Sequence, residues 1–167
     1  MGSKDHSFDV VSEVDLQEVD NAVQQAKKDL AQRCDFKGSD SSLDFDRTQK
    51  TITLKTENDF RLKALTDMLQ TKCVKRNVSL KSMEFGKVEA GMVGGSVRQV
   101  VTIQSGIPSE KAKQIVKAIK ELKVKAQPMI QEDKVRVQAT KIDDLQAVIG
   151  FLKSRDFGLD LQFSNYR

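Results

Sequence analysis

The sequence predicts an α+β protein that is built from two copies of one small unit. The order strand, helix, strand, strand, helix, strand begins at Phe8 and begins again at Val97. Every expected helix carries a single apolar stripe, and the expected strands alternate apolar and polar residues. A chain of 167 residues is also long enough to form two small domains.

The first unit is expected over residues 7–90. Its first strand covers residues 8–12, and a helix follows from Asp15, because Asp15-Leu16-Gln17-Glu18 is similar to a capping box. A hairpin joins strands around residues 42–46 and 51–55, and Asn58 is a good N-cap for the second helix. The last strand is expected from Leu80 to Phe85.

The second unit is expected over residues 96–167. It begins with a strand at 97–104 and a helix near Pro108-Ser109. A hairpin is expected to pair residues 124–127 with 134–137 across a turn at Glu132-Asp133, and a helix and a closing strand follow. Residues 86–96 are rich in glycine and are interpreted as the linker between the units. Residues 1–6 are interpreted as a leader or a cloning remnant.

This order of elements predicts the ferredoxin-like βαββαβ arrangement in each unit. Four antiparallel strands form a sheet, and the two helices cover one face of it. An antiparallel sheet tolerates an open second face. Functional residues are therefore sought on the open faces.

Residues suited to covalent chemistry are scarce, which disfavours an enzyme. The single histidine is His6, and two distant cysteines are too few for a zinc site of the Cys/His type. The segment from Gly86 to Val93 lacks the lysine and the hydroxyl residue of a phosphate-binding P-loop. We expect no catalytic activity, no metal and no cofactor.

No apolar run approaches the roughly 18 residues that a membrane-spanning helix needs. No hydrophobic signal segment follows the start of the sequence. We expect a cytoplasmic protein without a membrane partner.

Basic residues predict the kind of ligand. From Ser96 onward there are thirteen Lys/Arg against eight Asp/Glu, whereas the first 95 residues carry fifteen against sixteen. Strand alternation directs a basic and amide-bearing set of side chains to the open face of the second unit: Lys123, Lys125, Gln127, Lys134, Arg136 and Gln138. Lysine and arginine on such a face favour phosphate groups, although plain solvated surface is an equal alternative. The alternative location for the ligand is the cleft between the units, near Lys37 and the glycine-rich segment.

Four segments closely resemble the YajQ family of bacterial proteins. They are residues 7–15, Asp35-Phe36-Lys37-Gly38, Asp143-Asp144-Leu145-Gln146, and residues 161–167. The resemblance implies two ferredoxin-like domains that exchange their first strands, 8–12 and 97–104. It also implies nucleotide binding without enzymatic activity, with nucleic acid such as tRNA, or cyclic di-GMP, as ligands.

The expected function is therefore non-enzymatic binding of a GTP-like nucleotide, a cyclic dinucleotide or RNA. These strands present no outward aromatic residues, which disfavours reading of stacked RNA bases. The alternative is a protein-interaction module that acts in transcriptional regulation, with a regulatory protein as its partner.

Overall fold

The structure, a computed structural model, describes residues 5–33, 36, 38, 40–91 and 94–167. The chain divides into two compact units. One, here called the composite unit, joins the residues up to Glu13 with Ser105–Arg167. The other, the continuous unit, is Val14–Gln104. Each is described by itself.

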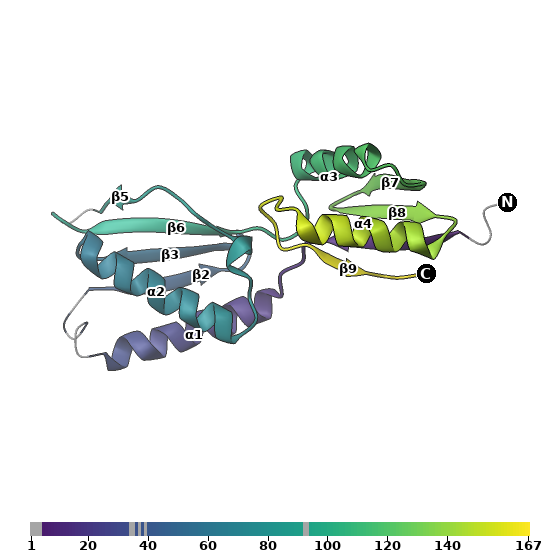
Figure 1. Cartoon of the computed structure of the whole chain (residues 1–167). Helices are drawn as coiled ribbons and strands as arrows, with labels where there is room; N and C mark the ends of the chain where they lie inside the picture. Colours follow the sequence, from purple (N-terminus) through teal and green to yellow (C-terminus); the bar gives the residue numbers. More distant parts are fainter. Residues whose placement is uncertain (1–4, 34–35, 37, 39, 92–93) are drawn as a thin grey trace. The chain divides into compact units, whose positions relative to one another are not determined.

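The continuous unit consists of two helices on one face of an antiparallel sheet (Figure 1). The strand order is β2-β3-β6-β4, and the short strand β5 also pairs with β6. In chain order the elements are α1 (Leu16–Gln32), β2 (Ser42–Asp46), β3 (Thr51–Thr56), α2 (Asp59–Lys75), a 3-10 turn (Leu80–Ser82), β4 (Met83–Phe85), β5 (Glu89–Ala90) and β6 (Val97–Ile103).

The composite unit repeats this architecture with the strand order β7-β8-β1-β9. Its elements are β1 (His6–Val11), α3 (Ser109–Glu121), β7 (Ala126–Gln131), β8 (Lys134–Ala139), α4 (Ile142–Ser154) and β9 (Gln162–Ser164). All strand pairs in both sheets are antiparallel. The predicted α+β class, with two repeated units, is confirmed.

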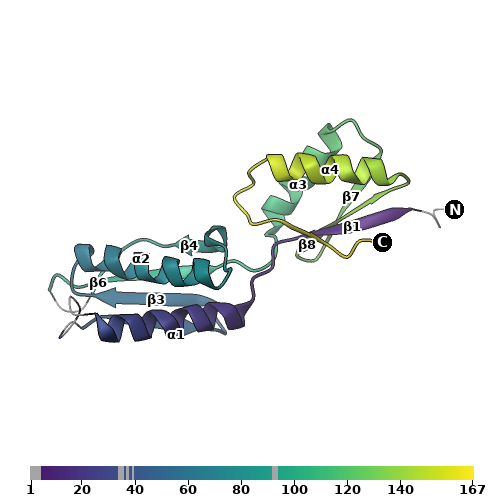
Figure 2. The same ribbon diagram turned by 60° about the horizontal axis from the view of Figure 1, so that its bottom comes forward.

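The first strand of the chain lies inside the sheet of the C-terminal elements. In Figures 1 and 2 the purple strand β1 runs beside the green strand β8, and it pairs with β8 and β9. Phe8 lies opposite Val137, and Val10 lies opposite both Val135 and Phe163. β6 in turn pairs with β3 and β4 of the continuous unit. β1 and β6 correspond to the two strands for which the family resemblance implied an exchange.

Local signals fix where the first two helices begin. The side chain of Asp15 accepts hydrogen bonds from the amides of Gln17 and Glu18, at 3.0 and 3.4 Å. Asn58 accepts one from the amide of Arg61 at 2.8 Å. These bonds satisfy amides that would otherwise lack partners in the first turn. Glu18 does not reach back as a capping box requires, because its carboxylate accepts from Asn21 and from Arg76.

Each unit has its own apolar core between its helices and its sheet. In the continuous unit the core includes Val19, Leu54, Leu65 and Val101, all fully buried. In the composite unit it includes Phe8, Ile115, Val137 and Val148, which are likewise fully buried. Two small cores fit the modest hydrophobic fraction of 38%.

The interpretation of residues 86–96 as a linker is wrong. Glu89–Ala90 pair with Val97–Arg98, and the amide of Gly91 donates to the carbonyl of Ser96 at 2.8 Å. This segment therefore belongs to a hairpin inside the continuous unit. A Cβ at Gly91 would press against the side chain of Ser96, so the close approach of the two strands favours glycine there. The chain passes between the units at 13–14 and 104–105.

Two expected strands also differ from those observed. The expected strand at Leu80–Phe85 begins only at Met83, because Leu80–Ser82 form a 3-10 turn that Ser79 caps. The hairpin of the composite unit runs from Ala126 to Gln131 and from Lys134 to Ala139. Its turn is only Glu132-Asp133, where Glu132 has a φ of 55°, so the strands flank the turn directly. The expected strand at 124–127 is therefore placed too early.

Candidate functional site

The helix-free face of the sheet in the composite unit, here called the polar face, gathers most of the residues that the sequence singled out. Val135, Val137 and Ala139 of β8 pack into the core, so the alternate residues of β8 point to the opposite face. The same alternation applies to β1, β7 and β9. The polar face therefore carries Ser7, Asp9, Gln127, Met129, Gln131, Lys134, Arg136, Gln138, Gln162 and Ser164.

The strand register arranges these side chains in rows across the sheet. Gln138 lies between Gln127 of β7 and Ser7 of β1. Arg136 lies between Met129 and Asp9. Four predicted residues, Gln127, Lys134, Arg136 and Gln138, are thus brought together on neighbouring strands.

Lys123 and Lys125 were expected on the strand face, but both precede β7. Lys125 nevertheless lines a hollow of about 400 Å³ with Gln127 and Gln138. The other described residues that line it are Asp5, Ala126, Ala139 and Thr140. Lys123 is exposed and does not line the hollow. Lys37 lies outside the described residues.

A buried carboxylate, which the sequence reasoning missed, lies at the centre of the polar face. Asp9 is only 2% exposed. Its oxygens accept hydrogen bonds from Nε of Arg136 at 3.0 Å and from Nδ2 of Asn165 at 2.9 Å. Nζ of Lys134 forms an ion pair with it at 3.3 Å. A charge that is removed from water in this way requires such partners.

These contacts determine the protonation state of Asp9. Burial alone would raise the pKa of this carboxyl group. Hydrogen bonds from Arg136, Asn165 and Lys134, together with the charge of Arg136, outweigh burial and lower the pKa to about 2. Asp9 in turn raises the pKa of Arg136. Asp9 is therefore a carboxylate at neutral pH.

Asp9 also fixes the orientation of Arg136. Nε of the guanidinium is bound to Asp9, whereas its two Nη groups form no hydrogen bond or ion pair with any described residue. The side chains of Arg136 and Lys134 are 23% and 33% exposed. They are partly buried and paired cations rather than the freely exposed ones that the sequence suggested. The Nη groups of Arg136 form a fixed fork of donors.

The charge asymmetry expected between the units disappears once β1 and β6 are assigned to their sheets. Asp5, Asp9 and Glu13 then belong to the composite unit, which carries thirteen Lys/Arg against eleven Asp/Glu. The continuous unit carries fifteen against thirteen. Both units have a net charge of +2, so local arrangement rather than net charge distinguishes the polar face.

Comparison with known sequences identifies the family of this two-unit α+β protein. The chain matches the family described as Nucleotide-binding protein YajQ-like over residues 6–167, and it belongs to that family. It is 55% identical to a nucleotide-binding protein of Geotalea uraniireducens over 161 residues, which cover 96% of this chain and 98% of the relative. A nucleotide-binding protein of Carboxydothermus hydrogenoformans is 51% identical over 165 residues, or 99% of each chain.

The similarity extends to other bacteria. A protein of Koribacter versatilis, also named a nucleotide-binding protein, is 50% identical over 163 residues and is covered to 98%. Within the part of the chain that the structure describes, every helix is too short or too polar to span a membrane.

Proposed function

We propose that the protein binds the phosphate groups of a nucleotide or of RNA on the polar face, without chemical turnover. The arrangement of Arg136 is the observation that carries this proposal. Asp9 holds the guanidinium through Nε, so both Nη groups are directed by a fixed contact and remain available for bidentate binding of a phosphate. The names of the relatives support the same ligand class.

The neighbouring side chains complement this contact. Lys125 adds a cation beside the amides of Gln127 and Gln138, and all three line one hollow. Amide groups both donate and accept hydrogen bonds, which suits ribose hydroxyls and base edges. A hollow of about 400 Å³ is within the usual range for small-ligand sites.

Salt dependence distinguishes a cyclic dinucleotide from a segment of RNA as the ligand. Each phosphate of a single strand that a protein contacts contributes about −0.7 to the slope of log K against log salt. A cyclic dinucleotide offers only two phosphates, so its slope is shallow. RNA that also contacts Lys123 and Lys134 gives a steeper slope.

The decisive variant is Lys125→Glu. Lys125 is exposed and forms no ion pair with a described residue, so its replacement leaves the fold intact. The control is Lys117→Glu on α3, which makes the same charge change on the helix-covered side of the same unit. We expect Lys125→Glu to weaken binding of RNA or cyclic di-GMP by about tenfold or more, and Lys117→Glu to have little effect.

Other outcomes would count against the polar face. Equal losses in the two variants would indicate diffuse attraction to the whole unit. Unchanged binding in both would place the ligand elsewhere, and an absence of any binding would favour the protein-interaction hypothesis.

A further inference from the structure

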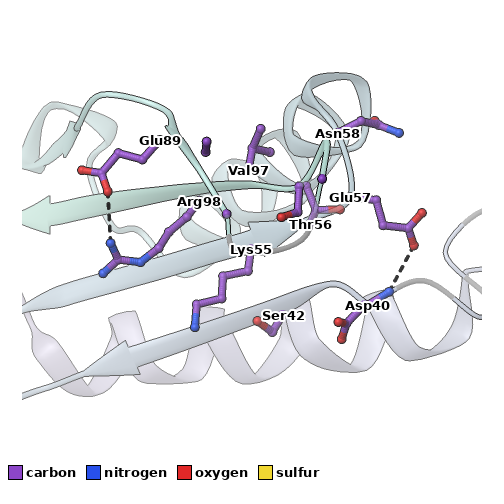
Figure 3. A pocket seen from close by; sticks show the side chains of 13 residues that line it. Asp40, Ser42, Lys55, Thr56, Glu57, Asn58, Glu89, Val97 and Arg98 are labelled. Carbon is purple, nitrogen blue, oxygen red and sulfur yellow. Dashed lines mark hydrogen bonds and ion pairs between the residues drawn. The ribbon is translucent and has the colours of Figure 1, made fainter.

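The continuous unit contains a cavity of about 870 Å³ that is lined by its own strands and loops. It lies where β3 ends and β6 begins, beside the hairpin of β5 and β6 (Figure 3). Its polar lining includes Asp40, Ser42, Lys55, Glu57, Glu89 and Arg98. A volume of this size accommodates a small molecule.

Two cations lie directly opposite each other on the floor of this cavity. The register places Ser42 beside Lys55, Lys55 beside Arg98, and Arg98 beside Glu89 in one row across four strands. Directly opposed side chains on neighbouring strands have Cβ atoms roughly 4.5–5.5 Å apart, and like charges in such pairs destabilise a sheet. The fold therefore accepts a repulsion at this point.

The residues around the row compensate only one of the two charges. Nη1 of Arg98 forms an ion pair with Glu89 at 3.3 Å. Lys55 forms neither an ion pair nor a hydrogen bond with any residue that the structure describes. Glu57 has other partners, because it accepts from the amide of Asp40 at 3.1 Å and lies 4.0 Å from Arg61.

Acceptors line the cavity beside these cations. They are the carboxylates of Asp40 and Glu57, which lie before β2 and after β3, and the hydroxyl of Ser42, next to Lys55 in the row (Figure 3). Carboxylates accept hydrogen bonds from the hydroxyl groups of a ligand. The cavity therefore combines two neighbouring cations, of which Lys55 is not neutralised by a described residue, with acceptors suited to hydroxyl groups.

We propose that this cavity is a second ligand site, separate from the polar face, and that it takes a sugar phosphate. The phosphate would neutralise Lys55 and accept hydrogen bonds from the remaining N–H groups of Arg98, and the sugar hydroxyls would bind Asp40, Glu57 and Ser42. The sugar phosphate is either a free metabolite or the ribose phosphate of a nucleotide. Both share the groups that the cavity recognises.

Calorimetric titration of the full chain with ribose 5-phosphate, AMP and ribose tests the proposal. We expect ribose 5-phosphate to bind and ribose not to bind, since the phosphate provides the charge. If AMP and ribose 5-phosphate bind with equal affinity, the sugar phosphate alone is sufficient for recognition. If AMP binds more tightly than ribose 5-phosphate, the ligand is a nucleotide. Either result supports the site. An absence of binding by both phosphates up to about 10 mM, beyond the range of weak specific sites, would overturn it.

Variants locate the binding. Lys55→Gln should weaken ribose 5-phosphate binding about tenfold, and Lys55→Arg, which keeps the charge, should largely preserve it. Lys63→Gln on α2 is the control, because Lys63 is exposed and does not line the cavity. Lys55→Gln should also leave the melting temperature of the ligand-free protein unchanged or raised, because it relieves the like-charge pair.

The two proposed sites can be tested independently of each other. Lys125→Glu should not alter ribose 5-phosphate binding, because Lys125 belongs to the composite unit. Unchanged affinity in Lys55→Gln, or an equal loss in Lys63→Gln, would exclude the cavity as the site.

Discussion

The carboxylate of Asp9 lies 3.0 Å from Nε of Arg136, and the two residues are 127 positions apart in the sequence. The bond joins β1, the first strand of the chain, to its neighbour β8 in the sheet. Asp9 is buried there. One contact therefore serves the stability of the composite unit and the orientation of the cation that we propose to bind phosphate. The two roles can be tested separately.

Asp9→Asn should destabilise the composite unit in a pH-dependent manner. The pKa of Asp9 is about 2 in the folded protein and about 3.9 in an unfolded chain. A lowered pKa stabilises the fold above the unfolded value, and this stabilisation is lost as the pH falls from about 4 toward 2. It amounts to about 2–3 kcal/mol at neutral pH. Wild type and variant should therefore differ at pH 7 and converge near pH 2.

The measurement is urea denaturation followed by the fluorescence of Tyr166. This residue is the only tyrosine, the chain lacks tryptophan, and Tyr166 belongs to the composite unit. Asp44→Asn is the control, because Asp44 is exposed and its pairing with Lys27 is in the continuous unit. A constant difference between Asp9→Asn and wild type over the whole pH range would contradict the assigned pKa.

Arg136→Glu should destabilise the composite unit far more than Lys125→Glu. The first change leaves the buried Asp9 without its main partner and places a second carboxylate beside it. The second change alters an exposed side chain and should cost no more than about 0.5 kcal/mol. The midpoints of Tyr166 fluorescence in urea measure both effects. Equal midpoints would show that Asp9 does not depend on Arg136. Binding experiments should therefore use Lys125 and not Arg136.

Features that depend on neighbouring residues were predictable from the sequence. The caps at Asp15 and Asn58 act within one helical turn. The placing of Lys134, Arg136 and Gln138 on one face follows from the period of two in a strand, which does not depend on its pairing partner. The turn at Glu132-Asp133 was also correct, although the strand before it was placed too early.

Features that depend on distant parts of the chain could not be predicted in the same way. An acidic residue between Phe8 and Val10 gives no signal of its partners, which follow only from the pairing of β1 with β8. The glycines of residues 86–96 suit a linker and a tight hairpin equally well, and only the pairing of β5 with β6 distinguishes them. The charge imbalance was misassigned for the same reason, because three acidic residues near the start of the chain belong to the composite unit.

Cys73 should be unreactive in the folded protein. It is completely buried in α2, and burial raises the pKa of its thiol to about 11. Only roughly one thiol in a thousand is then ionised at pH 8, and the thiolate is the reactive species. Peptide mass spectrometry after treatment with iodoacetamide should find Cys73 modified in urea and unmodified in buffer. Modification in buffer at the rate of an exposed cysteine would show that α2 opens readily.

Phe8→Ala and Ile103→Ala should destabilise different units, because Phe8 belongs to the composite unit and Ile103 to the continuous unit. Phe8 is fully buried in the core of the composite unit, and Ile103 is 2% exposed in that of the continuous unit. Removing such side chains typically costs about 3–5 kcal/mol for phenylalanine and about 2–5 kcal/mol for isoleucine. Phe8→Ala should lower the urea midpoint of Tyr166 fluorescence, because β1 lies in the same sheet as β9. Ile103→Ala should leave that midpoint in place while hydrogen exchange quickens in α1 and α2. If Ile103→Ala instead lowered the Tyr166 midpoint and Phe8→Ala quickened exchange in α1 and α2, β1 and β6 would each pair in the other sheet.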